Sequence, residues 1–234
     1  MNNLSDRLKL IADLVIPGES VADIGTDHGF VPIHLLAENI VPFAILTDVN
    51  QGPIDIAASH IKEVGINDML YDLRCGDGLQ TIKEGEVSTV IIAGMGGELI
   101  ENILDEDSVK SHSFKRLILQ PRTHANELRY FLTNNAFEFV DYRLVKEKFR
   151  ICEIFVVQPT DAGKVQPDYD LVSKFLIEKK DPLLKAFIDY KINSTKTVLN
   201  SLENSDNEDS KSQKDIFNVI LKELTDIKES INED

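Results

Sequence analysis

Two kinds of hydrophobic pattern divide the chain near residue 160. Before that point, short apolar and β-branched runs alternate with segments whose apolar residues recur at helical spacing. The strand-like runs cover residues 20–25, 43–48, 69–75, 88–94, 116–121, 137–145 and 151–158. The helical segments cover residues 28–39, 53–64, 80–83, 98–104 and 124–134. This alternation predicts an α/β fold with a doubly wound, mostly parallel, seven-stranded sheet.

The two ends of the predicted sheet domain differ from its middle. No helical segment separates the last two strands, so we expect them to form an antiparallel hairpin at the sheet edge. Ahead of the first strand, Leu4, Leu8, Ile11 and Val15 keep helical spacing. Ser5 is a suitable N-cap for this helix. A helix is therefore expected before the first strand.

From about residue 168 the chain contains no arginine and is predicted to be helical. Apolar positions there recur every three or four residues in two sets, which are Ile188, Ile192, Thr195, Leu199 and Leu202, and Phe217, Ile220, Leu224, Ile227 and Ile231. The polar segment 203–211 separates them, which predicts two antiparallel helices in a coiled-coil hairpin. Proline and glycine in residues 159–167 are typical of a connection. We expect a first domain over residues 1–160 and a helical coiled-coil domain over residues 161–234.

The composition is that of a globular protein, with 42% hydrophobic and 28% charged residues. No apolar run approaches the ~18 residues of a membrane helix, and the polar N-terminus lacks an apolar signal core. Cys75 and Cys152 have no zinc-site spacing, and the five histidines form no H-x-x-x-H pair. We expect a cytoplasmic protein without a metal centre or a membrane partner, either monomeric or weakly self-associating.

The charge is acidic overall but unevenly distributed. The formal net charge is −15, which on its own argues against a nucleic-acid partner. All seven arginines precede Ile151, however, and residues 115–150 hold eight basic against four acidic residues. A basic face and an evenly mixed solvated surface both remain open on charge alone.

Three acidic residues follow three successive predicted strands. Asp23 precedes a glycine-containing turn into a helix, Asp48 ends the second strand, and Asp77 lies in the glycine turn after the third. Open α/β sheets bind ligands at these strand ends. Each aspartate alone also suits a turn or a helix cap. Three of them in register favour a ligand site.

The ligand that this pattern favours is an adenosyl sulfonium rather than a dinucleotide. An acid at the end of the second strand can accept hydrogen bonds from both ribose hydroxyls. The dinucleotide fingerprint G-x-G-x-x-G admits a pyrophosphate, but Asp27 stands at its middle glycine. A carboxylate there repels pyrophosphate and tolerates a sulfonium and an ammonium group. We therefore predict S-adenosyl-L-methionine as the cofactor and S-adenosyl-L-homocysteine as its product.

The turns after the fourth and fifth strands add candidate substrate contacts. Residues 90–97 run from a strand into three glycines around Met95, which offers backbone amides and space for a flat base. A tight strand-to-helix turn is the simpler explanation of these three glycines. Gln120, Arg122 and His124 follow the fifth strand, and a cap or surface role is more common for such a histidine. No arrangement of serine, histidine and aspartate supports covalent catalysis.

The order of these motifs resembles the bacterial tRNA (adenine-22-N1)-methyltransferase family over nearly the whole chain. The resemblance rests on DIGTDHGF, TDVNQGP, CGDGL, IAGMGG, LILQP and the N-terminal LSDRL. It implies a class I S-adenosylmethionine-dependent domain, a C-terminal coiled coil, and an adenine in the D-arm region of tRNA as substrate. Phe30 stands where relatives often carry tyrosine, and Asp48 where some carry glutamate.

The resemblance also implies roles for individual residues. Asp27 is the catalytic candidate, because its carboxylate would stabilise positive charge on the methylated adenine. The predicted cofactor contacts are Asp23, Gly25, Thr26, Asp48, Val49, Gly76, Asp77, Gly78, Ala93 and Gly94. The predicted base contacts are His28, Phe30, Met95, Gly96, Gly97, Gln120 and Pro121. The predicted phosphate contacts are Arg7, Arg122 and Arg129.

Three other functions compete with this one. A methyltransferase acting on a protein or a small molecule suits the acidic net charge. A non-enzymatic module kept for its coiled coil would bind no cofactor, and the complete set of Asp23, Gly25, Asp48 and Asp77 argues against it. An oxidoreductase conflicts with the glycine pattern.

Overall fold

The computed structural model describes residues 4–161, 170–202 and 208–233. Its centre is one seven-stranded sheet in the order β3-β2-β1-β4-β5-β7-β6. The strands are β1 (Val21–Ile24), β2 (Ala44–Asp48), β3 (Tyr71–Cys75), β4 (Thr89–Met95), β5 (Arg116–Pro121), β6 (Phe137–Glu147) and β7 (Arg150–Pro159). The first five are parallel, and β7 pairs antiparallel with both β5 and β6. The predicted fold class and edge hairpin are confirmed.

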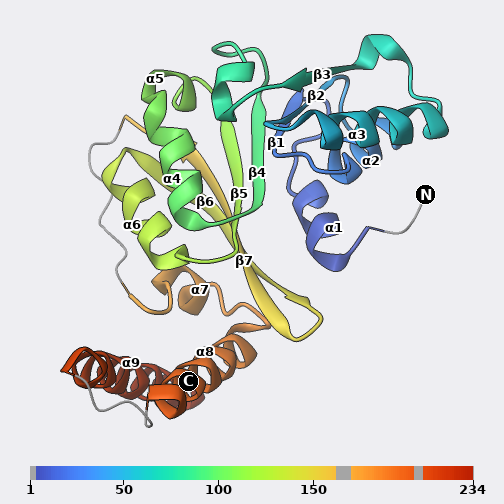
Figure 1. Cartoon of the computed structure of the whole chain (residues 1–234). Coiled ribbons are helices and arrows are strands. Elements are labelled where there is room, and N and C mark those ends of the chain that lie inside the picture. Colours follow the sequence, from blue (N-terminus) through green and yellow to red (C-terminus); the bar gives the residue numbers. More distant parts are fainter. Residues whose placement is uncertain (1–3, 162–169, 203–207, 234) are drawn as a thin grey trace.

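Helices cover both faces of this sheet (Figure 1). They are α1 (Asp6–Asp13), α2 (Phe30–Ala37), α3 (Gln51–Val64), α4 (Gly97–Glu106), α5 (Ser108–Ser111), α6 (Ala125–Asn134), α7 (Lys174–Glu178), α8 (Leu184–Leu202) and α9 (Glu208–Glu233). Short 3-10 turns are η1 (Asp68–Leu70) and η2 (Gly78–Thr81). The expected cap is present, since the Leu8 backbone N–H donates to the Ser5 hydroxyl.

Consecutive residues of the central strands enter two separate cores. In β4, Val90 and Ile92 pack in the cluster that α4, α6, α7 and α8 cover, whereas Ile91 packs in the cluster under α1, α2 and α3. A strand buried on both faces needs an almost unbroken apolar run. This requirement explains why the apolar runs at β4 and β5 clearly predict strands.

Several boundaries differ from the sequence prediction. Residues 69–70 lie in η1 rather than in a strand, because the Asn67 side chain caps that turn by accepting from the Met69 backbone N–H. Helix α2 begins at Phe30 rather than at residue 28, after Gly29 in the left-handed region. Helices α5 and α7 are too short to show periodicity and were not predicted as separate elements.

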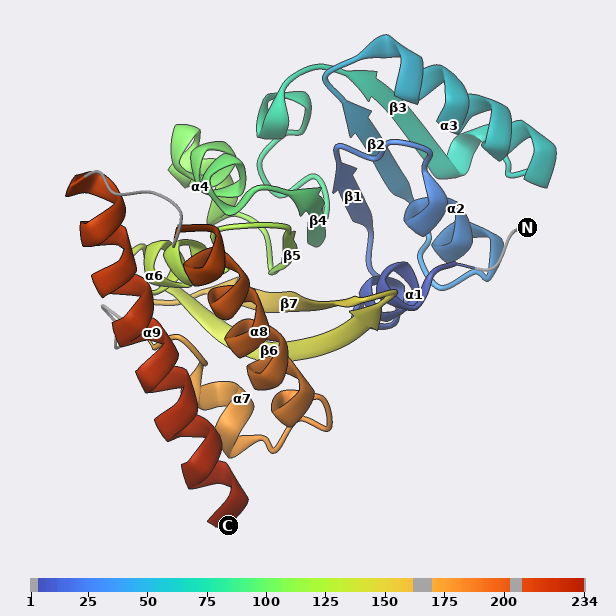
Figure 2. The ribbon, with the colours of Figure 1, turned by 60° about the horizontal axis from the view of Figure 1, so that its bottom comes forward.

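The C-terminal helices α8 and α9 contact each other and run side by side in opposite directions (Figure 2). Of the predicted apolar positions, Ile188, Ile192, Thr195 and Leu224 are buried. The first half of α8 packs on the sheet layer, since Phe187 and Ile188 share a core cluster with Phe155. Supercoiling of the two helices stays a prediction, and residues 203–207 of the predicted link lie outside the described residues. None of the helices described is long and apolar enough to cross a membrane.

Candidate active site

A cavity of about 610 Å³ opens at the carboxyl ends of β1 to β4. Every residue that the sequence assigned to the cofactor lines it, which are Asp23, Gly25, Thr26, Asp48, Val49, Gly76, Asp77, Gly78, Ala93 and Gly94. The parallel sheet explains this, because the residues that follow its strands share one edge. The strand order β3-β2-β1-β4 places the turns after these four strands next to one another.

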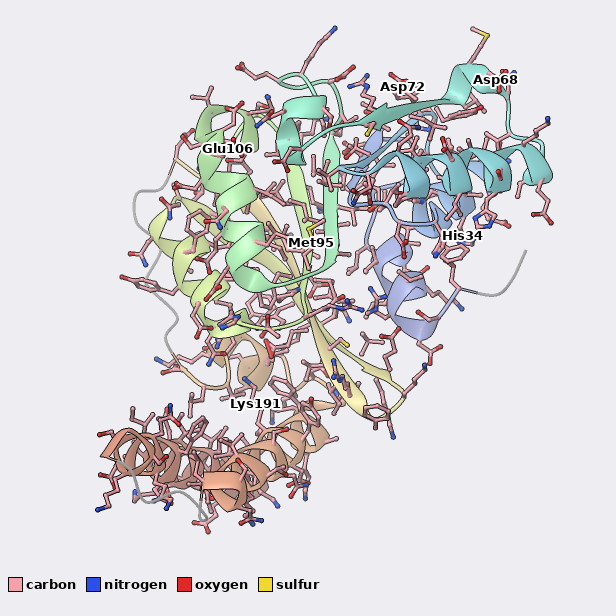
Figure 3. All side chains as sticks on the ribbon, in the orientation of Figure 1. His34, Asp68, Asp72, Met95, Glu106 and Lys191 are labelled. Carbon is pink, nitrogen blue, oxygen red and sulfur yellow. The ribbon has the colours of Figure 1, made fainter. Side chains whose placement is uncertain are left out.

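The turn after β1 packs its backbone against the Met95 side chain. Gly25 has a φ of 69°, in the left-handed region, and a Cβ there would lie 2.1 Å from Met95 Cε. The backbone conformation therefore favours glycine here, and any larger residue would also have to displace the flexible end of the Met95 side chain. Figure 3 shows Met95 at the end of β4, in the centre of the molecule.

Asp23 is the most buried acid of the cavity, with 7% of its surface exposed. Its Oδ2 accepts a 2.7 Å hydrogen bond from the Thr26 hydroxyl. Burial, together with the negative charge of Asp48 and against the lowering effect of the Thr26 hydrogen bond, raises the pKa of Asp23 to about 7. A cation placed in the cavity would favour the ionised form of this carboxyl.

The end of β2 carries one predicted and one unexpected polar group. Asp48 Oδ1 accepts a 2.9 Å hydrogen bond from the Asn50 backbone N–H, which orients the carboxylate. The Thr47 hydroxyl beside it is buried, lines the cavity, and has no hydrogen-bond partner among the described residues. A buried hydroxyl without a partner is costly, so it points to a polar ligand. Sequence reasoning missed Thr47, since threonine in a strand is ordinary.

Asp27 lies at the mouth of the same cavity. Its side chain is 74% exposed, with Oδ1 3.5 Å from His28 Nε2. Its φ of 53° is in the left-handed region, which aspartate tolerates better than most residues. The ring of Phe30 stacks on His60, with centroids 5.5 Å apart. His60, from α3, was not predicted, because its position in the helix sequence gives no sign of proximity to the turn after β1.

The predicted substrate residues after β5 line a second hollow, of about 550 Å³. Gln120, Pro121 and Arg122 lie there, and Arg7 and Arg122 line both cavities. Arg7 forms an ion pair with Glu147, with 3.1 Å between Nε and Oε2, and donates to Gln120 Oε1 at 3.1 Å. These contacts make Arg7 a link between α1, β5 and β6.

Three of the predicted substrate contacts, Gly96, Gly97 and Arg129, line neither cavity. Arg129 is 1% exposed, and its guanidinium donates to the Asn126 side chain and the Asp170 carbonyl, so it joins α6 to the segment before α7 and is not offered to a phosphate. Gly97 is buried at the start of α4 against the backbone of Thr123 and His124, and lines neither cavity. Gly97 is therefore packed at the junction of the turns that follow β4 and β5.

Gly96 and His124 are both helix N-cap residues, and of the two only His124 lines a hollow, the second one. Gly96 is the N-cap of α4 and lines neither cavity. His124 is the left-handed N-cap residue of α6, and its Nε2 lies 3.5 Å from Glu98 Oε1. Within the residues described, no cluster of three or more His, Cys, Asp and Glu side chains is suited to a metal ion.

The strand order, the acids at successive strand ends and the cavity that they line define a methyltransferase domain of the Rossmann-like type. A family model described as "Methyltransferase domain" matches residues 4–155. The chain belongs to the family of bacterial tRNA (adenine-22-N1)-methyltransferases. It is 31% identical to the tRNA (adenine(22)-N(1))-methyltransferase of Bacillus subtilis over 238 residues, covering 98% of this chain and 96% of the relative.

Solved structures agree with this assignment over the whole chain. The crystal structure of a Streptococcus pneumoniae protein described as a putative tRNA (m1A22) methyltransferase has a TM-score of 0.84 at 27% identity, covering 97% of this chain and all of that one. The same protein in complex with S-adenosyl-L-methionine has a TM-score of 0.83 at 26% identity, with the same coverage.

Proposed function

We propose that this protein transfers a methyl group from S-adenosyl-L-methionine to N1 of adenine 22, in the D-arm region of bacterial tRNA. The observation that carries the proposal is that all ten predicted cofactor residues line one cavity, in a chain similar from end to end to a tRNA (adenine(22)-N(1))-methyltransferase. The acidic net charge that suited a protein or small-molecule substrate does not outweigh that similarity.

The residues of the cavity fit the cofactor. S-adenosyl-L-methionine supplies an electrophilic methyl group on a sulfonium. Carboxylates of Asp23, Asp48 and Asp77 suit a cationic ligand, and the unpartnered Thr47 hydroxyl can pair with its polar atoms. We assign Asp48 to the ribose hydroxyls, Asp77 to the adenine amino group, and the turn at Gly25 to the methionine part.

The chemistry demands little proton transfer from the protein. Adenine N1 carries a free lone pair, so no protein base has to remove a proton before methylation. The chain orients the base, which in favourable cases is worth roughly 7–11 kcal/mol. Asp27 then stabilises the positive charge that develops on the ring, provided that the bound base excludes water from it.

The target base must leave its pairing or stacking environment to reach the cavity, at a cost of a few kcal/mol. His28, Phe30 and Met95 line the cavity that would receive it. Arg122 is the predicted phosphate ligand that stays exposed and lines both cavities. Gln120 and Pro121 would form the wall of the substrate site in the second hollow.

We propose that residues 1–160 bind the cofactor and that residues 161–234 form a helical coiled-coil domain. We also propose that the protein is cytoplasmic and either monomeric or weakly self-associating.

The decisive test is methyl transfer from labelled S-adenosyl-L-methionine into unmodified bacterial tRNA, followed by nucleoside mass spectrometry. We expect 1-methyladenosine, and none when adenosine 22 is replaced by guanosine. Cofactor binding without transfer to tRNA would refute the substrate assignment and support a protein or small-molecule acceptor instead.

Cofactor affinity should depend on pH through Asp23. The pKa of this carboxyl is about 7 in the free protein, and a cationic ligand binds its ionised form. Affinity should therefore be constant above pH 7 and fall by up to about tenfold per pH unit below it. Titration calorimetry with S-adenosyl-L-methionine between pH 5.5 and 8.5 measures this.

The matched variants are Asp23→Asn and Asp48→Asn. Asp23→Asn should bind S-adenosyl-L-methionine weakly, with an affinity that does not change with pH, because the titrating carboxyl is gone. Asp48→Asn should bind weakly and keep a pH-dependent affinity, with the fall displaced to lower pH because the charge of Asp48 no longer raises the pKa of Asp23. A wild-type affinity that is constant from pH 6 to 8 would contradict the role given to Asp23.

A further inference from the structure

The hairpin formed by β6 and β7 extends beyond the rest of the sheet. Its strands pair continuously up to Glu147 and Arg150. Strand β5, however, pairs with β7 only at Phe155, Val156 and Val157. The part nearer the turn therefore has no neighbouring strand on the β5 side, and Figure 1 shows it projecting from the sheet towards the space between α1 and α8.

The end of this hairpin, residues 146–150, is here named the hairpin tip. Phe149 at the turn is 80% exposed. Lys146, Lys148 and Arg150 around it are exposed, and none of them forms an ion pair within the described part of the chain. Glu147, the one acid of the tip, is paired with Arg7 outside it. An acidic protein thus presents three uncompensated cations around one exposed aromatic ring.

The hairpin tip is held in a fixed relation to the cofactor cavity. The ion pair between Glu147 and Arg7 joins the tip to α1, and Arg7 lines that cavity. Arg150 lines the second hollow together with Arg122, which also borders the cofactor cavity. Lys191 of α8, labelled in Figure 3, also lines that hollow. Arg150 of the tip and Arg122 at the cofactor cavity therefore border the same hollow, which Glu127, Glu147 and Glu153 also line.

We propose that the hairpin tip docks the tRNA strand beside the target adenosine, with Phe149 stacked on an unpaired base and Lys146, Lys148 and Arg150 on neighbouring phosphates. This inference rests on the proposed function. Exposed aromatic rings among cations are the usual means of holding opened or single-stranded RNA. An anionic membrane would also suit such a tip, but Arg150 shares a hollow with Arg122, which borders the cofactor cavity, and this proximity to the site of methyl transfer favours the RNA.

The first test compares Phe149→Ala with Phe149→Leu, Phe149→Trp and the control Met69→Ala, which truncates an equally exposed side chain (83%) at the opposite sheet edge. We expect Phe149→Ala to raise both KM for tRNA and the Kd for tRNA without cofactor by about 5- to 150-fold. Phe149→Leu should also weaken tRNA binding, whereas Phe149→Trp should bind tRNA as tightly as the wild type. The control Met69→Ala should behave like the wild type. Affinity for S-adenosyl-L-methionine should not change.

The second test addresses the cations. Lys148→Gln should reduce the slope of log Kd against log salt by about 0.7–0.9, the share of one phosphate contact, whereas Lys62→Gln on α3 should leave it unchanged. Wild-type tRNA affinity in Phe149→Ala, or binding of the tip to anionic vesicles with unchanged tRNA kinetics, would overturn the docking role alone. A wild-type protein that does not methylate tRNA would overturn the proposed function instead.

Discussion

Asp27→Asn is expected to lower kcat for tRNA methylation by about 10²- to 10³-fold, the size of effect seen when one preorganised electrostatic group is removed. The carboxylate lines the cavity mouth, and methylation of adenine N1 creates a ring with positive charge. Asparagine tolerates the left-handed backbone that Asp27 adopts, so the variant removes charge without disturbing the turn. Single-turnover kinetics with saturating cofactor and tRNA measure the effect.

The pattern of changes in Kd and kcat should distinguish Asp27 from the residues that bind the cofactor. The Kd for S-adenosyl-L-methionine should change little in Asp27→Asn, because the side chain is largely exposed at the cavity mouth. Asp77→Asn should show the reverse pattern, with a weaker cofactor affinity and a kcat close to the wild type at saturation. An Asp27→Asn protein with wild-type turnover would remove Asp27 from the electrostatic role.

The sheet was predictable because its burial has a simple periodic signature. Val90, Ile91 and Ile92 enter both cores, and only a strand covered on two faces requires such a run. The length of the β6–β7 hairpin was not predictable, because Lys146 to Arg150 are polar or exposed and carry no core pattern. Helix α7 is one turn long, and its position depends on packing against β6 rather than on its own periodicity.

The cofactor side of the site was predictable because topology alone brings the ends of parallel strands together. The substrate side of the site was less predictable from the sequence. Arg129 carries the same charge as Arg122 in the sequence, yet it is on the buried face of α6, where packing decides its environment. The burial of Thr47 at the cavity and the contact of His60 with Phe30 arise from tertiary structure, which a single sequence does not display.

The packing of Gly97 between two turns is likewise a tertiary feature that the sequence does not display. The backbone N–H of Gly97 donates to the Thr123 carbonyl at 2.8 Å, and that of Arg122 donates to the Met95 carbonyl at 2.7 Å. These bonds join the turn after β4 to the turn after β5. A Cβ on Gly97 would lie 2.3 Å from the His124 carbonyl oxygen and 2.8 Å from that of Thr123. Backbone atoms cannot move aside as a side chain can, so the two turns would have to separate.

We therefore expect Gly97→Ala to destabilise the protein by about 3 kcal/mol, the upper range for overpacking, and to lower Tm by roughly 6–12 °C. Tight binding of cofactor and tRNA should suffer as well, because Met95 and Arg122 belong to the joined turns. Gly96→Ala is the matched control. Gly96 has a φ of −66°, and its added Cβ would meet only the Thr123 hydroxyl, at 3.3 Å, which can rotate away. Thermal unfolding of both variants measures the difference, and equal Tm values would show that the two turns are not coupled through Gly97.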